Sequence, residues 1–422
     1  MTRLKPQLNL FQGIGLLVTT LLGTGIFVVP GLSAQMIGHQ SLLAWAILLM
    51  VTLPIALTFA SLGKRYPHAG GVPHVVGQAF GRGFEKYCAF LFISILPVGI
   101  PASLIIGTGF ITAVIPLSPL AILAVQILML VGMFTTGFYG SNACAKMQTP
   151  IAIFIMVLVV LLLGNADLKP ADVQVHWQFN TPLLKTLGIM FWCIIGLEAF
   201  VHLGEEFKKP QRDFPLALIL GTIITLALYW CANVVVLKYS AQQPLSSQAG
   251  SLPAIASQLF GPKVGLLVST LGFLSCFACT NTYIQGAARL LWSLAQEQKL
   301  PTFMAQLNRH QAPLPALLVT TGFIMLMTWL IWFIGLDLSQ LLLYCNGSFI
   351  AIYLLAMLAG CTLLKGFGRG LAIFSAIICI IFMWSLGTEI GYLLIFSMIF
   401  IILQWIQRYH QTHRLTRQKI TR

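Results

Sequence analysis

Charged side chains are scarce in this chain. They make up only 8% of its 422 residues, and Asp and Glu together number 10. A soluble globular domain carries about 25% charged residues, so a water-soluble fold of this length could not cover its surface. Hydrophobic residues reach 58%, and the mean hydropathy is +0.90. These values exclude a soluble globule and predict an integral membrane protein.

Short motifs that carry enzyme chemistry are also missing. The chain has no HExxH or GxSxG sequence and no pair of Asp residues inside an apolar stretch, which disfavours a membrane enzyme. Its nine cysteines are scattered, and the one close pair, Cys276-x-x-Cys279, lies in an apolar stretch without a nearby His. We therefore expect no metal site, no cofactor and no disulfide framework.

Apolar stretches of about 20 residues, the length of one membrane crossing, recur along the whole chain. They lack the alternating pattern of membrane strands. We therefore predict an all-α protein with twelve transmembrane helices in a single domain, residues 1–422. The predicted spans are Leu10–Ile37, Leu42–Leu62, Phe84–Val114, Leu120–Gly140, Met147–Gly164, Leu183–Gly204, Phe214–Val236, Val264–Leu294, Leu314–Gly335, Leu338–Leu364, Leu371–Leu386 and Ile390–Ile406.

Lys and Arg are distributed unevenly between alternate loops. If the N-terminus is cytoplasmic, all but four of the 24 Lys and Arg lie on the cytoplasmic side. This is the positive-inside signal, and an even number of spans also places the C-terminus in the cytoplasm. The net charge of +14 then requires no nucleic-acid partner, and we expect the basic tail, residues 408–422, near anionic lipid head groups. The four exceptions are Lys169, Lys185, Lys238 and Lys263.

Glycines interrupt two apolar stretches that hold corresponding positions in the two halves of the chain. Gly23-Thr24-Gly25 falls in the first stretch, and Ile195-Gly196 falls in the sixth. Such breaks free backbone N–H and C=O groups at membrane depth, which is tolerated where they face a cavity or a ligand, and paired breaks mark transporter sites. The half-helix that follows would present partial positive charge to a carboxylate. One such motif alone favours close helix packing, but the second break favours ligand binding.

Glu198 is the one acidic residue deep inside an apolar stretch. Placing a carboxylate there costs about 2.5–3.5 kcal/mol on insertion scales. Because desolvation disfavours the charge, Glu198 could carry a proton during coupled transport. The structural alternative is an interhelical hydrogen bond from a neutral carboxyl group. His202 lies four residues further on the same helical face, where it either relays protons or packs at an interface.

Four motifs, in order along the whole chain, resemble those of the amino acid–polyamine–organocation transporters. The first is similar to the family's glycine-rich substrate motif, the second to an inner loop, the third to the unwound sixth helix, and the fourth to the charged signature after that helix. They are Gly23–Pro30, Pro67–Gly71 with Phe80-Gly81, Phe191–Glu198, and Glu205–Pro210 with Pro215–Ala217, in which Lys209 replaces the usual Asn.

This resemblance implies two inverted repeats of five helices, with helices 1 and 6 discontinuous, and two extra C-terminal helices. The repeats would cover about residues 8–165 and 180–365, and the extra helices about 369–407. It also implies alternating access around a site halfway through the membrane. By motif position, the ligand carboxylate would meet the Gly25 amide and the Thr24 hydroxyl, and its ammonium the carbonyls of Leu21, Trp192 and Ile195. The implied substrate-binding residues are Leu21, Gly23, Thr24, Gly25, Ile26, Trp192, Ile195 and Gly196.

Within this family, the sequence FWC-x-x-GLEAF-x-H resembles bacterial exporters of L-methionine and branched-chain amino acids. No Lys, Arg or Asp lies in mid-helix near either break, and neighbours such as Ile26, Phe191 and Trp192 are apolar. We therefore expect proton-coupled export of neutral apolar amino acids across the bacterial inner membrane. Site chemistry does not set direction, so an uptake permease or an exchanger is the alternative. A channel would need rings of carbonyls or charges, which two unequal breaks do not resemble.

Overall fold

The computed structural model describes residues 8–66, 71–138, 142–201, 207–240, 251–296, 300–309 and 312–420. Within these ranges the chain is helical and has no strand, apart from a single bridge between Leu8 and Phe207. The all-α class is thus confirmed. The α-helices are α1 (Leu10–Leu22), α2 (Gly25–Ile37), α3 (Ser41–Arg65), α4 (Gly71–Phe80), α5 (Arg82–Ser94), α6 (Leu96–Thr112), α7 (Pro119–Phe138), α8 (Asn142–Asn165), α9 (Thr181–Met190), α10 (Leu197–Val201), α11 (Asp213–Ser240), α12 (Ser251–Phe260), α13 (Pro262–Gln296), α14 (Leu314–Ile334), α15 (Leu338–Leu363), α16 (Phe367–Ser385) and α17 (Ile390–Ile420).

Nine helical stretches of the described residues are long and apolar enough to cross a membrane. Three apolar helices are shorter, Leu10–Leu22, Ile153–Asn165 and Thr181–Ile194. Two of these three are the first halves of the spans in which breaks are predicted. The class of integral membrane protein is therefore confirmed, and the count of twelve helices stays a prediction. The short helices α4 and α12, ten residues each, were not predicted because they are too short to span a bilayer.

Polar side chains mark the starts of α1 and α15. Asn9 and Gln12 form a capping box at the start of α1, and Asp337 and Gln340 form one at the start of α15. Each box satisfies backbone N–H groups that have no partner within the helix. These local signals set where the two helices begin, whereas apolar composition sets how far they run.

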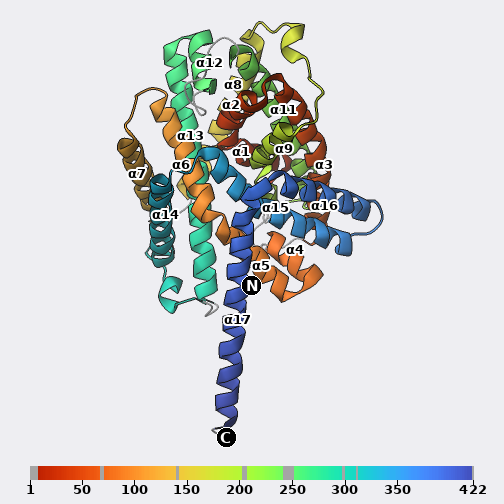
Figure 1. The fold of residues 1–422 in the computed structure, drawn as a ribbon, viewed down its shortest axis with the longest axis vertical. Helices are drawn as coiled ribbons and strands as arrows, with labels where there is room; N and C mark the ends of the chain where they lie inside the picture. Colours follow the sequence, from red (N-terminus) through yellow and green to blue (C-terminus); the bar gives the residue numbers. More distant parts are fainter. Residues whose placement is uncertain are drawn as a thin grey trace.

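Buried apolar side chains form two clusters. The larger one includes Trp45 of α3, Tyr229 of α11 and Tyr353 of α15. The smaller one, with Leu104, Met133, Ile284 and Leu317 among its members, lies between α6, α7, α13 and α14. Figure 1 places α7 and α14 together on one flank of the bundle. The two predicted breaks lie within the larger cluster, since Leu22, Ile26 and Ile195 belong to it.

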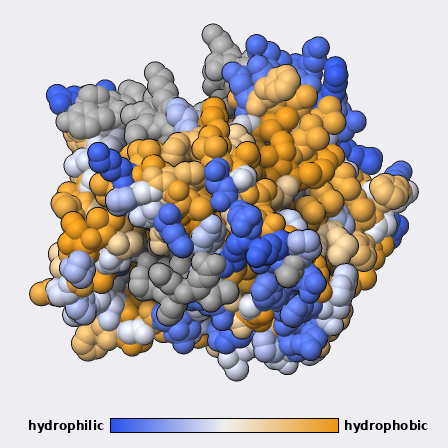
Figure 2. Space-filling view, turned by 90° about the horizontal axis from the view of Figure 1, so that it is seen from above, coloured by the Kyte–Doolittle hydropathy of each residue, from blue (hydrophilic) through white to orange (hydrophobic). Residues whose placement is uncertain are grey.

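Many apolar side chains face outward, as expected for a surface covered by lipid. Figure 2, seen along the long axis, shows hydrophobic residues over much of the perimeter and hydrophilic residues over part of the end facing the viewer. The last helix, α17, extends away from the bundle and carries the C-terminus at its far end (Figure 1). It continues to Ile420, so the basic tail begins as an extension of this helix.

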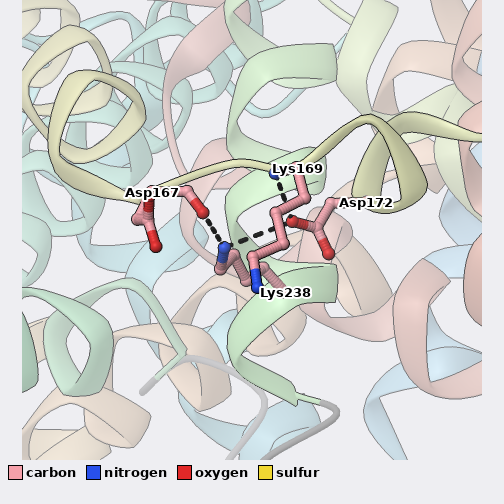
Figure 3. Close-up of polar contacts among 4 residues, drawn as sticks. All are labelled: Asp167, Lys169, Asp172 and Lys238. Atoms are coloured by element: carbon pink, nitrogen blue, oxygen red, sulfur yellow. Dashed lines mark hydrogen bonds and ion pairs between the residues drawn. The ribbon is translucent and has the colours of Figure 1, made fainter.

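The connection between α8 and α9 is fastened to the end of α11. The Lys238 ammonium donates to the Asp167 carbonyl and forms an ion pair with Asp172 Oδ2 at 3.2 Å (Figure 3). Asp172 Oδ2 also accepts a hydrogen bond from the Lys169 backbone N–H at 2.8 Å. The Lys169 bond and the Lys238 contact hold the pKa of the Asp172 carboxyl below its usual value. This lysine clasp, Asp167, Lys169, Asp172 and Lys238, contains two of the four lysines that the sequence analysis expects outside the cytoplasm.

Candidate functional site

The first predicted break is present between α1 and α2. Helix α1 ends at Leu22, and α2 begins at Gly25. Gly23 has φ +28°, in the range that residues with a Cβ rarely adopt. The turn is buried, with Thr24 only 5% exposed. Backbone groups at this turn are therefore released from the helix inside the protein.

Tyr229 of α11 covers the end of α1. Its hydroxyl donates to the carbonyl of Leu21 at 2.9 Å and contacts that of Leu22 at 3.3 Å. The last carbonyls of a helix lack partners within it, so this hydroxyl satisfies part of that need. The Tyr229 ring is fully buried and stacks on Trp45, with centroids 4.9 Å apart. A carbonyl oxygen has two lone pairs, so Leu21 can still accept a second hydrogen bond.

The start of α2 is joined to the second break. No side chain caps the N-terminus of α2, so its first N–H groups are not satisfied by an N-cap side chain. Thr24 Oγ1 instead accepts a hydrogen bond from Trp192 Nε1 at 3.1 Å. On the other side of the turn, Ser275 of α13 donates to the Gly23 carbonyl at 3.3 Å. Thr24 and Trp192, far apart in sequence, are therefore in contact.

The second predicted break is also present. After α9 the chain forms a 3-10 turn at Phe191–Ile194, and Ile195 is extended, with ψ 127°. Gly196 then has φ +125°, which strongly favours glycine, and α10 begins at Leu197. A Cβ on Gly196 would lie 2.8 Å from the Thr20 side chain. The two breaks therefore approach each other through α1 as well as through Trp192.

Glu198 is the only buried Asp or Glu among the residues that the structure describes, and it is 1% exposed. Its Oε2 accepts a hydrogen bond from the Gly196 backbone N–H at 2.8 Å. The hydroxyl of Tyr353, on α15, lies 2.6 Å from the same oxygen and 2.7 Å from the Ile194 carbonyl. Glu198 thus forms a hydrogen bond within the second break, to Gly196, and a contact with α15, through Tyr353.

The Tyr353 ring packs against two other aromatic rings. Its ring meets the rings of Phe59 and Phe191 nearly edge to face, with centroids 5.0 and 5.2 Å away. Such pairs are favourable and exclude water. The Glu198 carboxyl therefore contacts its polar partners in a largely apolar part of the core.

Most of the predicted substrate-binding residues meet at the two breaks. Gly23, Thr24, Gly25 and Ile26 lie in or directly after the first turn, and all are buried. His202, predicted as a proton relay, lies outside the described residues, as do the motif segments 67–70 and 202–206. Their predicted roles stay predictions.

Sequence reasoning missed three polar side chains that contact the breaks. They are Tyr229, Tyr353 and Ser275, on α11, α15 and α13. Each is a polar group inside an apolar span, which is the signal that singled out Glu198. A hydroxyl group is a weaker signal than a carboxyl group, because Ser and Thr commonly form hydrogen bonds between membrane helices.

Comparisons with known proteins agree with this architecture. A family model described as amino acid permease matches residues 8–420. The L-methionine/branched-chain amino acid exporter YjeH of Escherichia coli (strain K12) is 43% identical over 398 residues, which cover 94% of this chain and 95% of that relative. The serine/threonine exchanger SteT of Bacillus subtilis (strain 168) is 25% identical and covers 71% of this chain and 70% of its own. The putrescine transporter PotE of Escherichia coli (strain K12) is 22% identical, with coverages of 72% and 71%.

These matches decide the broad class. The relatives are named as an exporter, an exchanger and a transporter, which confirms the prediction of a transporter and not an enzyme. The resemblance to the amino acid–polyamine–organocation transporters is confirmed as well, since the family model covers nearly the whole chain. The chain belongs to the amino acid permease family.

Proposed function

We propose that this chain is a secondary active transporter that exports L-methionine and branched-chain amino acids. The observation that carries the proposal is the pair of buried helix breaks joined by the Trp192–Thr24 hydrogen bond. Freed backbone groups at such breaks suit the two ends of a zwitterion. The exporter relative, 43% identical over 94% of this chain, supports this substrate class and this direction.

The substrate would bind mainly through the backbone. Its carboxylate meets the Gly25 N–H and the Thr24 hydroxyl at the positive end of α2. Its ammonium meets carbonyls of Leu21, Trp192 and Ile195. Gly23 and Gly196 supply the turns, and Ile26 contributes an apolar wall.

An apolar, uncharged substrate side chain fits the surroundings of the breaks. No Lys or Arg is buried in the part of the chain that the structure describes, and Glu198 is the only buried acid there. A negative second charge on the substrate would therefore lack a cationic partner. A positive one would find only Glu198, whose Oε2 already bonds to Gly196 and Tyr353. Discrimination among Met, Leu, Ile and Val should be modest, since one methylene is worth only about 1–3 kcal/mol.

The proposal includes the arrangement that the family resemblance implies. It has twelve helices in two inverted repeats of five plus two extra helices, and alternating access around the breaks. Both termini lie in the cytoplasm, and the protein resides in the bacterial inner membrane. The loop charges support this orientation, and the basic end of α17 would lie near anionic lipids.

Proton coupling through Glu198 is part of the proposal. The Tyr353 hydroxyl has one hydrogen but two oxygen neighbours, Ile194 O at 2.7 Å and Glu198 Oε2 at 2.6 Å. When Glu198 is ionised, Tyr353 donates to the carboxylate. When Glu198 is protonated, it can donate to Tyr353, which then donates to Ile194 at the break. A proton on Glu198 would thereby change a hydrogen bond at the substrate site, with His202 as a further candidate in the relay.

An amino-acid exchanger is the second candidate. The relative SteT is named as a serine/threonine exchanger and is 25% identical over 71% of this chain. The same backbone site would serve exchange, because it would bind a zwitterion whether the site is open to one side of the membrane or to the other. The two candidates differ in whether an amino acid on the opposite side is required.

Reconstituted vesicles test both candidates. Purified protein in liposomes is loaded with labelled methionine, and efflux is measured with and without a pH gradient and with and without external amino acid. Saturable efflux that the pH gradient drives, without external amino acid, supports export. Efflux only in the presence of an external amino acid supports exchange. No saturable flux of methionine or leucine in either arm contradicts the proposed substrate class.

A further inference from the structure

Helix α15 contacts the second broken span on both sides of its break. Asn346 Nδ2 donates to the carbonyls of Gly188 and Ile189, at 2.8 and 3.2 Å, in the last turn of α9. Tyr353, seven residues further along α15, contacts Ile194 and Glu198. Seven residues make about two helical turns, so both side chains project from one face. One uninterrupted helix therefore touches the span before and after the break.

Asn346 meets a need that the break creates. The carbonyls near the end of a helix lack regular partners within it, and α9 gives way to a 3-10 turn at Phe191. The Ile189 carbonyl is contacted there by the Phe191 N–H as well as by Asn346. Asn346 is fully buried, and its Oδ1 has no hydrogen-bond partner among the described residues. Burying such an acceptor costs free energy. An apolar side chain would avoid this cost. The favourable contribution of the Asn346 amide therefore comes from the two hydrogen bonds that Nδ2 donates.

The first broken span is held in a similar way by α11. Tyr229 contacts the last carbonyls of α1. Asn233, four residues further along α11, accepts a hydrogen bond from Ser33 Oγ of α2 at 3.1 Å. Each break is thus contacted on both sides by a single continuous helix. Asn346 is the member of this arrangement that touches the segment leading into Trp192 and Ile195.

We propose that Asn346 is a positioning residue for substrate binding. By holding the end of α9 against α15, it sets where the 3-10 turn begins and so where the Trp192 and Ile195 carbonyls and the Trp192 indole lie. It acts through these groups and does not itself touch the substrate. The effect on substrate binding rests on the proposed function, whereas the effect on the backbone of α9 does not.

Asn346→Leu tests this role, because leucine has a similar size and no donor. Asn281→Leu is the matched control. Asn281 is also fully buried. Its Nδ2 donates to Thr136 of α7 at 2.9 Å, and its Oδ1 accepts from Gln285 of α13 at 3.1 Å. In proteoliposomes, Asn346→Leu should raise the KM for methionine about tenfold, because the displaced Trp192 and Ile195 carbonyls would lose about 1.4 kcal/mol of substrate binding, while the maximal rate changes less than about twofold. Asn281→Leu should leave KM unchanged.

Hydrogen exchange provides a readout that needs no substrate. In Asn346→Leu, amide exchange in residues 188–196 should accelerate, and in Asn281→Leu it should not. If neither exchange in this segment nor KM changes in Asn346→Leu, the proposal is wrong. Faster exchange with an unchanged KM also overturns it, because the residue then serves stability alone. If Asn346→Leu does not fold, Asn346→Ser, which keeps one donor, should show the same two effects at smaller size.

Failure of the proposed function would look different. The wild-type protein would then show no saturable methionine flux at all. Exchange in residues 188–196 would still separate Asn346→Leu from the control if Asn346 positions this segment. An unchanged exchange pattern in that case would overturn the positioning role too.

Discussion

Gly25 has no room for a side chain, because the Tyr229 hydroxyl lies where a Cβ would be. An added Cβ would come within 2.3 Å of Tyr229 Oη, and the next atom, Cζ, is at 3.3 Å. Sequence reasoning gives Gly25 one role, to bring its N–H to a carboxylate. The structure adds a second, the close approach of Tyr229. A bulky substitution would therefore abolish transport for either reason.

A pair of variants separates these two reasons. Gly25→Ala alone should destabilise the protein by about 1–3 kcal/mol, as overpacking does. Adding Tyr229→Phe removes the oxygen at 2.3 Å and should recover part of that loss, seen as a higher melting temperature in detergent. Tyr229→Phe alone is the control. No recovery in the double variant would show that Tyr229 is not the cause of the clash.

Glu198→Gln replaces the carboxyl by a neutral group of the same shape. Both the Gly196 N–H and the Tyr353 hydroxyl bond to Glu198 Oε2. A Gln amide oxygen at that position can accept from both, so the fold of the second break should persist. If Glu198 carries the coupled proton, the variant should transport methionine with a flat pH profile, because Gln has no proton to exchange. Efflux at a series of internal and external pH values measures this. A profile that keeps the wild-type shape would assign the proton elsewhere.

At the scale of helices, the breaks were predictable and their partners were not. Glycines at 23 and 196 mark positions where φ is positive, and only glycine adopts such angles freely. The sequence therefore indicated where α1 ends and where the backbone turns at Gly196, although α9 already ends at Met190. It did not indicate that α11 and α15 supply the groups that cover these ends, because those contacts join residues up to 208 positions apart.

The lysine clasp between the α8–α9 connection and α11 should respond to charge. Lys238→Met removes the contacts to Asp167 and Asp172, so hydrogen exchange in residues 166–173 should accelerate. Lys263→Met, at an exposed lysine near the start of α13, is the control and should change nothing there. Equal exchange in the two variants would mean that the clasp does not hold the connection.

The same clasp should loosen in acid. The pKa of Asp172 is lowered by the Lys169 backbone hydrogen bond and by Lys238. A carboxyl with a lowered folded-state pKa stabilises the protein above its unfolded pKa, about 3.9, and loses this effect as pH falls through its folded value. Exchange in residues 166–173, corrected for intrinsic rates, should therefore rise below about pH 4 in the wild type. Lys238→Met should show a smaller rise, and an equal rise would contradict the pairing.

At the scale of the whole molecule, the distribution of charge predicts substrate selectivity. Among the residues that the structure describes, Glu198 is the only buried Asp, Glu, Lys or Arg. Arginine should therefore compete poorly with methionine, at least tenfold more weakly than leucine, because its guanidinium would be desolvated without a dedicated partner. Inhibition of methionine efflux by both amino acids measures this. Comparable inhibition would contradict an apolar site.

The sequence alone determined the class of the protein, its richness in long apolar helices and the two breaks. These follow from local properties: the near absence of charge, the length of each apolar run, and glycine where the backbone needs positive φ. Motif order also identified the family. Such features need no knowledge of which helices become neighbours.

Only the tertiary structure decided how the breaks are held. It placed the Trp192 indole on Thr24, Tyr229 on the end of α1, Asn346 on the end of α9, and Tyr353 between Ile194 and Glu198. These are single hydrogen bonds between distant segments, and apolar helices of similar composition could pack in many ways. Which polar group meets which freed backbone atom therefore depends on the packing of the whole bundle.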